Sequence, residues 1–137
     1  MSSQQQSHNS NDYSSLYNIG LQVVDDNNGN LLITGDDIYN QTLISDIPDL
    51  YETEDIVDPI CPIKLFTPDS NWSWFLLELS KEDKDYCFGY VVGLVSELGY
   101  FTLSEIEEVN GPLGLQVERD LSFQTIPLSK VKELEVD

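Results

Sequence analysis

The side chains of this chain that could do acid–base or metal chemistry are almost all carboxylates. Its only histidine, His8, lies in a polar N-terminal segment, so it cannot anchor a Ser or Cys triad or a histidine-ligated zinc in a folded core. Carboxylates could converge as a Mg²⁺ site or as a general acid and base, and the alternative is an ordinary exposed face. The candidate acids are Asp69, Glu78, Glu97, Glu105, Glu118 and Asp120.

Arg119 is the only arginine and lies between two of these acids, Glu118 and Asp120. Because its planar guanidinium matches a carboxylate, we expect a buried or bidentate pairing that helps to specify the fold. No GxxxxGK[ST] or GxGxxG phosphate loop occurs, and the segment around Asn28-Gly29 does not fit a calcium loop. We therefore predict no catalytic residues, metal ligands or cofactor, and the sequence favours a non-catalytic protein over an enzyme.

Net charge is the strongest signal in the sequence: 25 acids face 6 bases, which gives −19. Such a surface repels nucleic-acid phosphates and anionic membranes, so we expect neither as a direct partner. Excess acid can simply keep a small protein soluble, but it can also attract a basic protein. Residues 1–58 contain eleven acids and no Lys or Arg. The predicted partner-binding residues are Asp25, Asp26, Asp36, Asp37, Asp49, Glu52, Glu54, Asp55 and Asp58.

The sequence predicts a cytoplasmic protein. No apolar stretch approaches the ~20 residues of a membrane-spanning helix. The polar N-terminus has neither the basic nor the apolar part of a secretory signal. Cys61 and Cys87 are far apart and in apolar contexts, which favours buried, inert thiols over a redox pair or metal ligands.

A chain of 137 residues is expected to form one domain. Residues 1–15 contain almost no apolar side chains and are predicted to be a disordered tail, which leaves residues 16–137 as a single α+β domain. Asn28-Gly29 between two apolar runs indicates a β-hairpin. The acidic segment 36–58 is predicted to form a short helix followed by an extended, partly docked loop.

From Cys61 the sequence predicts an antiparallel meander with short helices on one face. A short helix after the capping residue Ser104 ends at Asn110-Gly111-Pro112, and residues 118–123 can return to the sheet. A terminal helix at 127–136 carries Pro127 in its first turn. The predicted strands of the meander are 63–66, 72–79, 86–95 and 98–102.

Aromatic side chains are dense in the predicted sheet. Alternation in the strand 72–79 puts Trp72, Trp74, Leu76 and Glu78 on one face and Ser73, Phe75, Leu77 and Leu79 on the other. Either this strand is sandwiched between two layers, or one aromatic face is exposed to a partner; we expect Trp74 in the core. The residues to which we assign structural roles are Trp74, Glu78, Gly99, Glu118, Arg119 and Asp120.

Residues 49–128 resemble an uncharacterised family, the domain of unknown function numbered 2958. The resemblance rests on DLYETEDI, KLFTPDSNWSWFLLEL, FGYVVG, ELGYFTLSEIE and GPLGLQVERDLSF, which follow one another in this order. It implies no established activity. Members of that family are small bacterial, plasmid-borne and phage-borne proteins, so the resemblance implies a role in plasmid or phage biology by association only.

Three functions agree with these observations. The first is an acidic interaction protein, in one version a DNA mimic that inhibits a basic, nucleic-acid-handling protein. The second is a carboxylate-based, metal-dependent enzyme, which needs converging acids in a pocket. The third is a structural or assembly accessory with one exposed apolar patch. We expect the first, with a basic protein as the partner.

Overall fold

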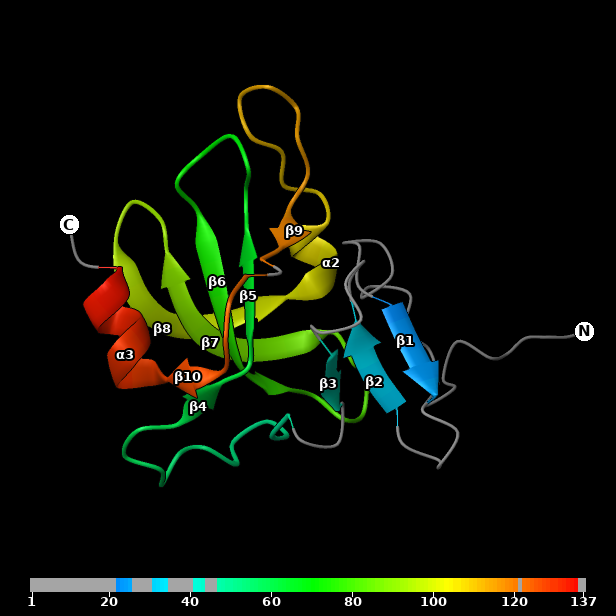
Figure 1. Ribbon diagram of the computed structural model, residues 1–137, viewed down its shortest axis with the longest axis vertical. Helices are drawn as coiled ribbons and strands as arrows, with labels where there is room; N and C mark the ends of the chain where they lie inside the picture. Colours follow the sequence, from blue (N-terminus) through cyan, green and yellow to red (C-terminus); the bar gives the residue numbers. More distant parts are fainter. Residues whose placement is uncertain (1–21, 26–30, 35–40, 44–46, 121, 136–137) are drawn as a thin grey trace, which may run out of the picture.

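The strands predicted between residues 63 and 102 form one antiparallel sheet (Figure 1). The structure is a computed structural model and describes residues 22–25, 31–34, 41–43, 47–120 and 122–135. The sheet has the strand order β8-β7-β6-β5-β9, so β8 and β9 are its two edges. Its strands are β5 (Ile63–Phe66), β6 (Ser73–Leu79), β7 (Tyr86–Val92), β8 (Ser96–Thr102) and β9 (Glu118–Arg119).

The predicted meander is confirmed, with three boundaries moved: β6 begins at Ser73 and not at 72, β8 begins at Ser96 and not at 98, and β7 is shorter than predicted. β7 ends at Val92, where the sequence predicted a strand as far as Val95. The chain reverses at residues 93–95, and the N–H of Gly93 donates a hydrogen bond to the carbonyl of Val95 at 3.0 Å. The ring of Trp72 covers Gly93 so closely that a Cβ there would overlap it, which explains why glycine stands at this turn.

A β-bulge in β6 changes the predicted faces of this strand. The register with β7 shifts between Leu76 and Glu78, so Leu77 is the extra residue. Leu79 therefore joins the core cluster of Trp74 and Leu76 instead of the cluster of Leu77. Glu78, predicted on the Trp74 face, lines a groove together with Leu77 on the other side.

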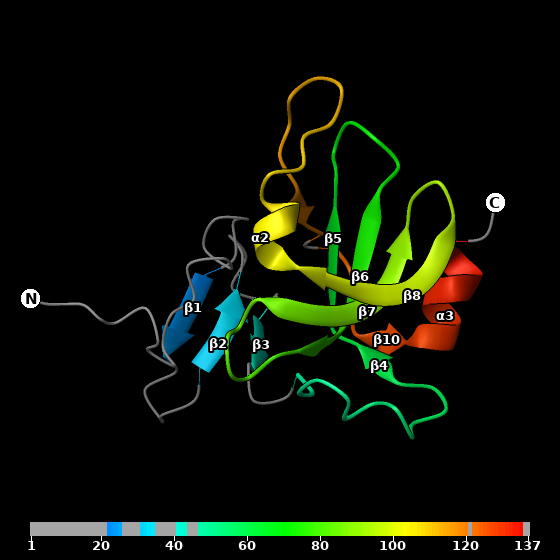
Figure 2. The same ribbon diagram turned by 180° about the vertical axis from the view of Figure 1, so that it is seen from behind.

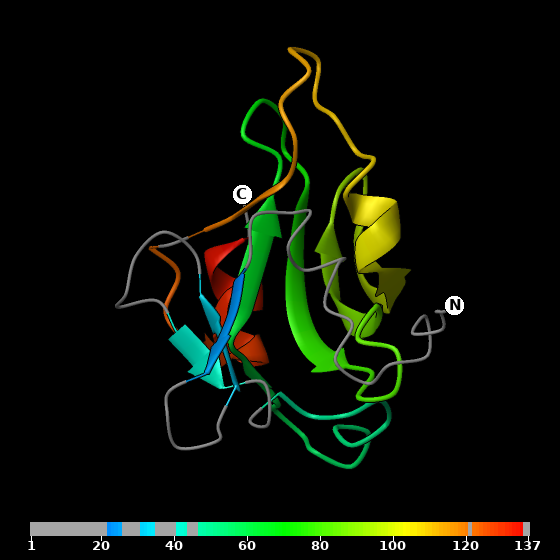
Figure 3. The ribbon, with the colours of Figure 1, turned by 90° about the vertical axis from the view of Figure 1, so that its right-hand side faces the viewer.

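The sheet is buried on both faces, and this shows that β6 is sandwiched between two layers. Trp74 is in the larger of the two core clusters, with Leu103 and Ile106 of α2 (Leu103–Ile106). The smaller cluster contains Leu128 and Val131 of α3 (Leu128–Leu134). The α+β class is thus confirmed, but the helices lie on opposite faces and not on one (Figures 2 and 3). No helix among the described residues is long and apolar enough to span a membrane.

Both helices begin at caps that the sequence did not predict. The N-cap of α2 is Thr102, whose hydroxyl accepts a hydrogen bond from the N–H of Glu105 at 3.1 Å, and Ser104 lies inside the single turn. Pro127 is the N-cap of α3 and not a first-turn residue. It ends β10 (Ile126–Pro127), which pairs with β4 (Ile60–Cys61).

The N-terminal part forms a second, three-stranded antiparallel sheet. It contains β1 (Gln22–Asp25), β2 (Leu31–Thr34) and β3 (Gln41–Leu43). Pairing of β1 with β2 confirms the predicted hairpin, although Asn28-Gly29 itself lies outside the described residues. The short helix predicted within 36–58 is wrong at 41–43, where the chain is strand β3. The predicted tail, residues 1–15, also lies outside the described residues.

Candidate functional site

A buried carboxylate on β6 fixes the conformation of the loop that begins at Asp49. Glu78 is 1% exposed, and it accepts hydrogen bonds from the N–H of Tyr51 at 2.9 Å and the N–H of Thr53 at 3.0 Å. The hydroxyl of Thr53 donates a third bond to the same carboxylate. A buried charge is stable only when its oxygens are satisfied, and here three donors of one loop satisfy them.

These bonds hold Tyr51 in a left-handed conformation. Its φ is 71°, a value that costs a non-glycine residue free energy and that persists only when its surroundings impose it. The other end of the loop is fixed by Asp49, which accepts hydrogen bonds from the N–H of Lys81 at 3.0 Å and of Leu50 at 2.8 Å. The bond from Lys81 is the main cause that lowers the pKa of Asp49.

The result is a cluster of aromatic rings at the surface, which we call the tyrosine cluster: Tyr51, Tyr86, Phe88 and Tyr100. Tyr100 lies at its centre, 4.8 Å from the ring of Phe88, 5.5 Å from Tyr86 and 6.2 Å from Tyr51 (centroid distances). The rings of Tyr86 and Tyr100 are stacked. Tyr51 is 56% exposed and Tyr100 47% exposed, so much of this aromatic surface faces solvent.

A groove of about 300 Å³ continues the tyrosine cluster between the loop and the start of α3. Its wall is polar as well as apolar, and the polar side chains that line it include Thr53, Glu54, the buried Glu78 and Lys132. The apolar part of the wall includes Ile56, Val57, Phe88, Leu98 and Leu128. Leu98 comes from β8 and is 44% exposed, so the groove opens at the edge of the sheet.

The electrostatics of this surface favour positive charge. The pKa of Tyr100 is raised by burial and then by the neighbouring Tyr51, Glu78 and Glu54, all of which oppose a further negative charge. Glu52, Glu54 and Asp55 are exposed on the same loop. A cation on the tyrosine cluster would gain both from the negative faces of the rings and from these carboxylates.

The predicted partner-binding acids divide into three groups. Asp25 is the last residue of β1, and the structure describes its backbone but not its side chain. Asp26, Asp36 and Asp37 lie outside the described residues. Asp49, Glu52 and Asp58 accept hydrogen bonds from backbone N–H groups and thereby fix local structure. Glu54 and Asp55 are exposed on the loop that Glu78 holds, and Glu54 lies beside Tyr100 of the tyrosine cluster.

The six candidate acids of a carboxylate enzyme do not form one site. Glu97 is on β8 and Glu118 on β9, the opposite edges of the sheet, which are about 19 Å apart at a spacing of about 4.8 Å per strand. Asp69 accepts hydrogen bonds from the N–H of Leu113 at 2.6 Å and of Leu115 at 3.4 Å. Among the described residues, no group of three or more His, Cys, Asp or Glu side chains could hold a metal ion.

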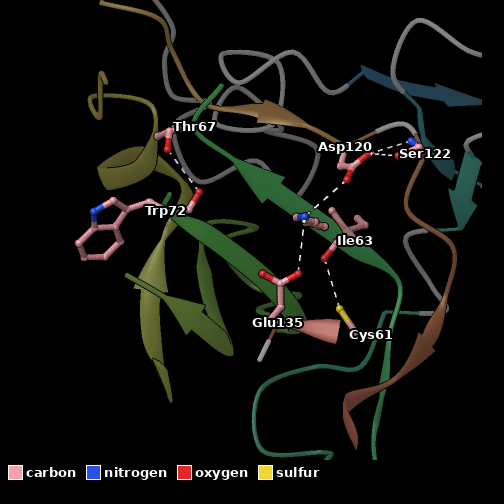
Figure 4. A network of polar contacts seen from close by, with 8 residues as sticks. Cys61, Ile63, Thr67, Trp72, Asp120, Ser122 and Glu135 are labelled. Carbon is pink, nitrogen blue, oxygen red and sulfur yellow. Dashed lines mark hydrogen bonds and ion pairs between the residues drawn. The ribbon is translucent and has the colours of Figure 1, made fainter. Parts of the chain in front are cut away.

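Asp120 belongs to a polar network beside β5 (Figure 4). Its carboxylate lies 3.6 Å from the ammonium of Lys64, and the same ammonium lies 4.0 Å from the carboxylate of Glu135. The Asp120 carboxylate also accepts hydrogen bonds from the N–H and the hydroxyl of Ser122. Burial opposes ionisation of Asp120, but the bonds from Ser122 and the charge of Lys64 outweigh it and lower the pKa. Asp120 thus pairs with Lys64, while burial lowers the pKa of Arg119, which faces Leu65 in the ladder.

The structure also places two other residues to which the sequence assigned structural roles, Trp74 and Gly99. Trp74 is 6% exposed, and its ring stacks on the more exposed Trp72 at 6.0 Å. A Cβ added to Gly99 would meet nothing within 4 Å, so no packing contact requires glycine there.

Sequence reasoning identified the aromatic residues but not the surface that they form. It placed the choice between core and partner surface on the strand 72–79, where Trp74 is buried and Trp72 is exposed, whereas the tyrosine cluster lies on β7, β8 and the loop at Tyr51. Leu98 and Tyr100 are two residues apart in a strand, which is the one local signal that they share a face. Tyr51 joins them only through its bond to Glu78, 27 residues away.

The fold and this surface define a class: a small acidic α+β protein with an aromatic groove at the edge of an antiparallel sheet. Residues 33–134 match the family model of the proteins of unknown function called DUF2958, and the chain belongs to this family. No curated protein and no solved structure matches the chain.

Proposed function

We propose that this protein is a non-catalytic interaction protein that binds a basic protein through the tyrosine cluster and its groove. The observation that carries the proposal is the position of Tyr51. A left-handed backbone and a buried carboxylate are both costly, and together they hold a tyrosine at the surface against Tyr100. Tyr51 is exposed and does not add to the core, so we infer that its function is to present an aromatic ring to a partner.

The chemistry of this surface suits lysine and arginine. Tyrosine rings attract a cation over their faces, and tyrosine is enriched at the centres of protein interfaces because it is large and rigid. Glu54 stands beside Tyr100 and would pair with the same cation. The net charge of −19 adds long-range attraction, which speeds the encounter of the two proteins.

The test is a titration of the ¹⁵N-labelled protein with a synthetic lysine-rich peptide, followed by NMR. We expect chemical-shift changes at Tyr51, Tyr86, Leu98 and Tyr100, and weaker binding by the variants Tyr100→Ala and Glu54→Gln. Glu105→Gln is the matched control, because it removes the same charge from α2 on the opposite face of the sheet. Added salt should weaken the complex, since exposed charges are screened beyond about 10 Å at 0.1 M.

Shift changes spread evenly over all exposed carboxylates would contradict the proposal, because they would show attraction to net charge alone. Equal loss of affinity in Glu54→Gln and Glu105→Gln would do the same. A complex indifferent to salt would favour the structural accessory, whose contact is apolar. The carboxylate enzyme would instead need turnover that depends on one of its six candidate acids.

A DNA mimic is the specific version that the acidic loop favours. Glu52, Glu54, Asp55 and Asp58 follow one another within seven residues and are all exposed. The partner would then be a basic protein whose DNA site these carboxylates occupy. The protein should displace duplex DNA from such a partner in a gel-shift assay, and Glu105→Gln should displace it equally well. Simultaneous binding of DNA and this protein would exclude the mimic but not the interaction.

We place this encounter in the cytoplasm. Cys61 and Cys87 are free thiols, and burial raises the pKa of Cys61 to about 12 and that of Cys87 well above its ordinary value. Free thiols suit a reducing compartment, where they are not oxidised. Oxidative cross-linking of the protein within intact cells would argue for another location.

A further inference from the structure

The strand β8 is an open edge of the main sheet. It pairs with β7 over all seven of its residues, without a bulge, and no other strand among the described residues pairs with it. The opposite edge, β9, has only two residues. Short edge strands resist pairing with another chain, whereas a long, regular one is a template for it.

The hydrogen-bond pattern shows which residues of β8 face outward. Leu103 donates to Asp85 at one end of the ladder and Gly93 donates to Val95 at the other. Bonded pairs alternate with non-bonded pairs in an antiparallel ladder, so Glu97, Gly99 and Phe101 bond to β7. The N–H and C=O groups of Ser96, Leu98 and Tyr100 therefore point away from the sheet.

The usual devices that protect an edge are missing from β8. Natural edges carry Lys, Pro or a bulge, but the sequence of β8, SELGYFT, has neither residue and its only charged side chain is Glu97. Leu98 and Tyr100 direct their side chains to the groove, so an added strand would lie directly beside it.

We infer that β8 accepts an extended segment of the basic partner as a sixth strand. This inference rests on the proposed function and specifies how the partner binds. Outward N–H and C=O groups of Leu98 and Tyr100 would bond to the segment's backbone, and alternate lysine or arginine side chains would lie by Tyr100 and Glu54. Charge selects this occupant over a second copy of the chain, because two copies would each bring a net charge of −19 and repel one another.

Amide hydrogen exchange of the full-length protein tests the inference. The probe is a synthetic peptide of alternating lysine and threonine, long enough to span β8. We expect the amides of Leu98 and Tyr100 to exchange rapidly in the free protein and about tenfold or more slowly at saturation. Those of Gly99 and Phe101 should be protected already, because they bond to β7.

A pair of substitutions separates the backbone from the side chain. Leu98→Pro removes an outward N–H without removing a bond to β7, and proline is tolerated at edges in this orientation. Leu98→Ala keeps the N–H and shortens the side chain. We expect Leu98→Pro to weaken the peptide by about tenfold more than Leu98→Ala does. Unchanged protection of Gly99 and Phe101 in Leu98→Pro would show that its β7–β8 ladder is intact.

Several results would overturn strand addition. One is saturation by the peptide without protection of the Leu98 and Tyr100 amides; if Tyr100→Ala and Glu54→Gln still weaken binding, the proposed function stands. Protection of these amides in the free protein would show that the chain itself, or at rising concentration a second copy, occupies β8. Failure of the peptide to bind at all would refute both proposals.

Discussion

Aspartates and glutamates have different structural roles in this protein. Among the aspartates whose side chains are described, six accept hydrogen bonds from backbone N–H groups, a role that suits a short side chain. They are Asp49, Asp58, Asp69, Asp83, Asp85 and Asp120. Glutamates such as Glu54, Glu82 and Glu97 are exposed instead. Surface charge should therefore be tested on glutamates, because removing an aspartate also releases a loop.

Two glutamates depart from this division: Glu52 accepts a hydrogen bond from the N–H of Asp49, and the buried Glu78 accepts bonds from Tyr51 and Thr53. The substitution Glu78→Gln puts an amide N–H₂ among the donors of Tyr51 and Thr53, so one oxygen must serve three donors. We expect the free energy of unfolding to fall by about 2–4 kcal/mol in urea titration. Glu82→Gln, an exposed change of the same kind, should leave it nearly unchanged. Equal stability of both variants would mean that Glu78 does not hold the loop.

Substitution of Gly111 should be destabilising for a steric reason. A Cβ there would overlap the carboxylate of Asp69, which bonds the N–H groups of Leu113 and Leu115. We expect Gly111→Ala to lower the unfolding free energy by about 1–3 kcal/mol, the usual cost of overpacking. Gly99→Ala is the control, because the space beside Gly99 is open. A larger loss at Gly99 than at Gly111 would contradict this account.

At the scale of elements, distant carboxylates complete both helices. Asp85 accepts bonds from the N–H of Ser104 at 2.8 Å and from its hydroxyl at 2.9 Å, and Asp58 binds Ser129 of α3 in the same way. These bonds satisfy N–H groups that the first turn of a helix leaves without partners. Each helix is short, so its position depends on such contacts more than on its own propensity.

Removal of the Asp85 carboxylate, which accepts hydrogen bonds from Ser104 in α2, should therefore loosen the helix. We expect Asp85→Ala to lower the unfolding free energy by about 1–2 kcal/mol, the range measured for lost N-caps, with faster amide exchange at Ser104. Glu108→Ala, an exposed change just after α2, should cost much less. Loss of stability without faster exchange at Ser104 would place the effect of Asp85 elsewhere.

Local signals predicted most of the main sheet, and long-range contacts account for the errors. The strand Ile63–Phe66 matches its prediction because alternation and flanking turns define it locally. The bulge at Leu77 and the end of β7 at Val92 depend on neighbouring strands and on Trp72. The helix expected from Ser104 began earlier because Thr102 takes the cap. Alternation likewise could not show that α2 and α3 cover opposite faces.

The candidate site was less predictable for the same reason. Glu52, Glu54 and Asp55 were identified by charge, and the aromatic residues by their density. Tyr51 reaches Tyr100 only because Glu78 imposes a positive φ on it, and no local pattern predicts a left-handed tyrosine.

At the scale of the whole molecule, the bound aspartates set the response to acid. The pKa values of Asp49, Asp58, Asp83 and Asp120 are lowered from the ordinary value of 3.8. A lowered folded-state pKa means that the unfolded chain binds protons first, so this stabilisation is present above pH 3.8 and is lost as pH falls through the folded values. We expect the free energy of unfolding to decrease below about pH 4. Increasing stability over that range would mean that relief of charge repulsion outweighs the lost hydrogen bonds.

The connections between β4, β10 and α3 also have a kinetic consequence. β6, β7 and β8 follow one another along the chain, so their pairing closes only short loops, whereas Cys61 pairs with Ile126 and Asp58 binds Ser129, 71 residues away. Loop closure over such a separation must wait for the intervening sheet. Substitutions in the β7–β8 hairpin should therefore slow refolding, while Val131→Ala in α3 should mainly accelerate unfolding in stopped-flow experiments. The C-terminal helix would thus be the last element to fold and the first to detach.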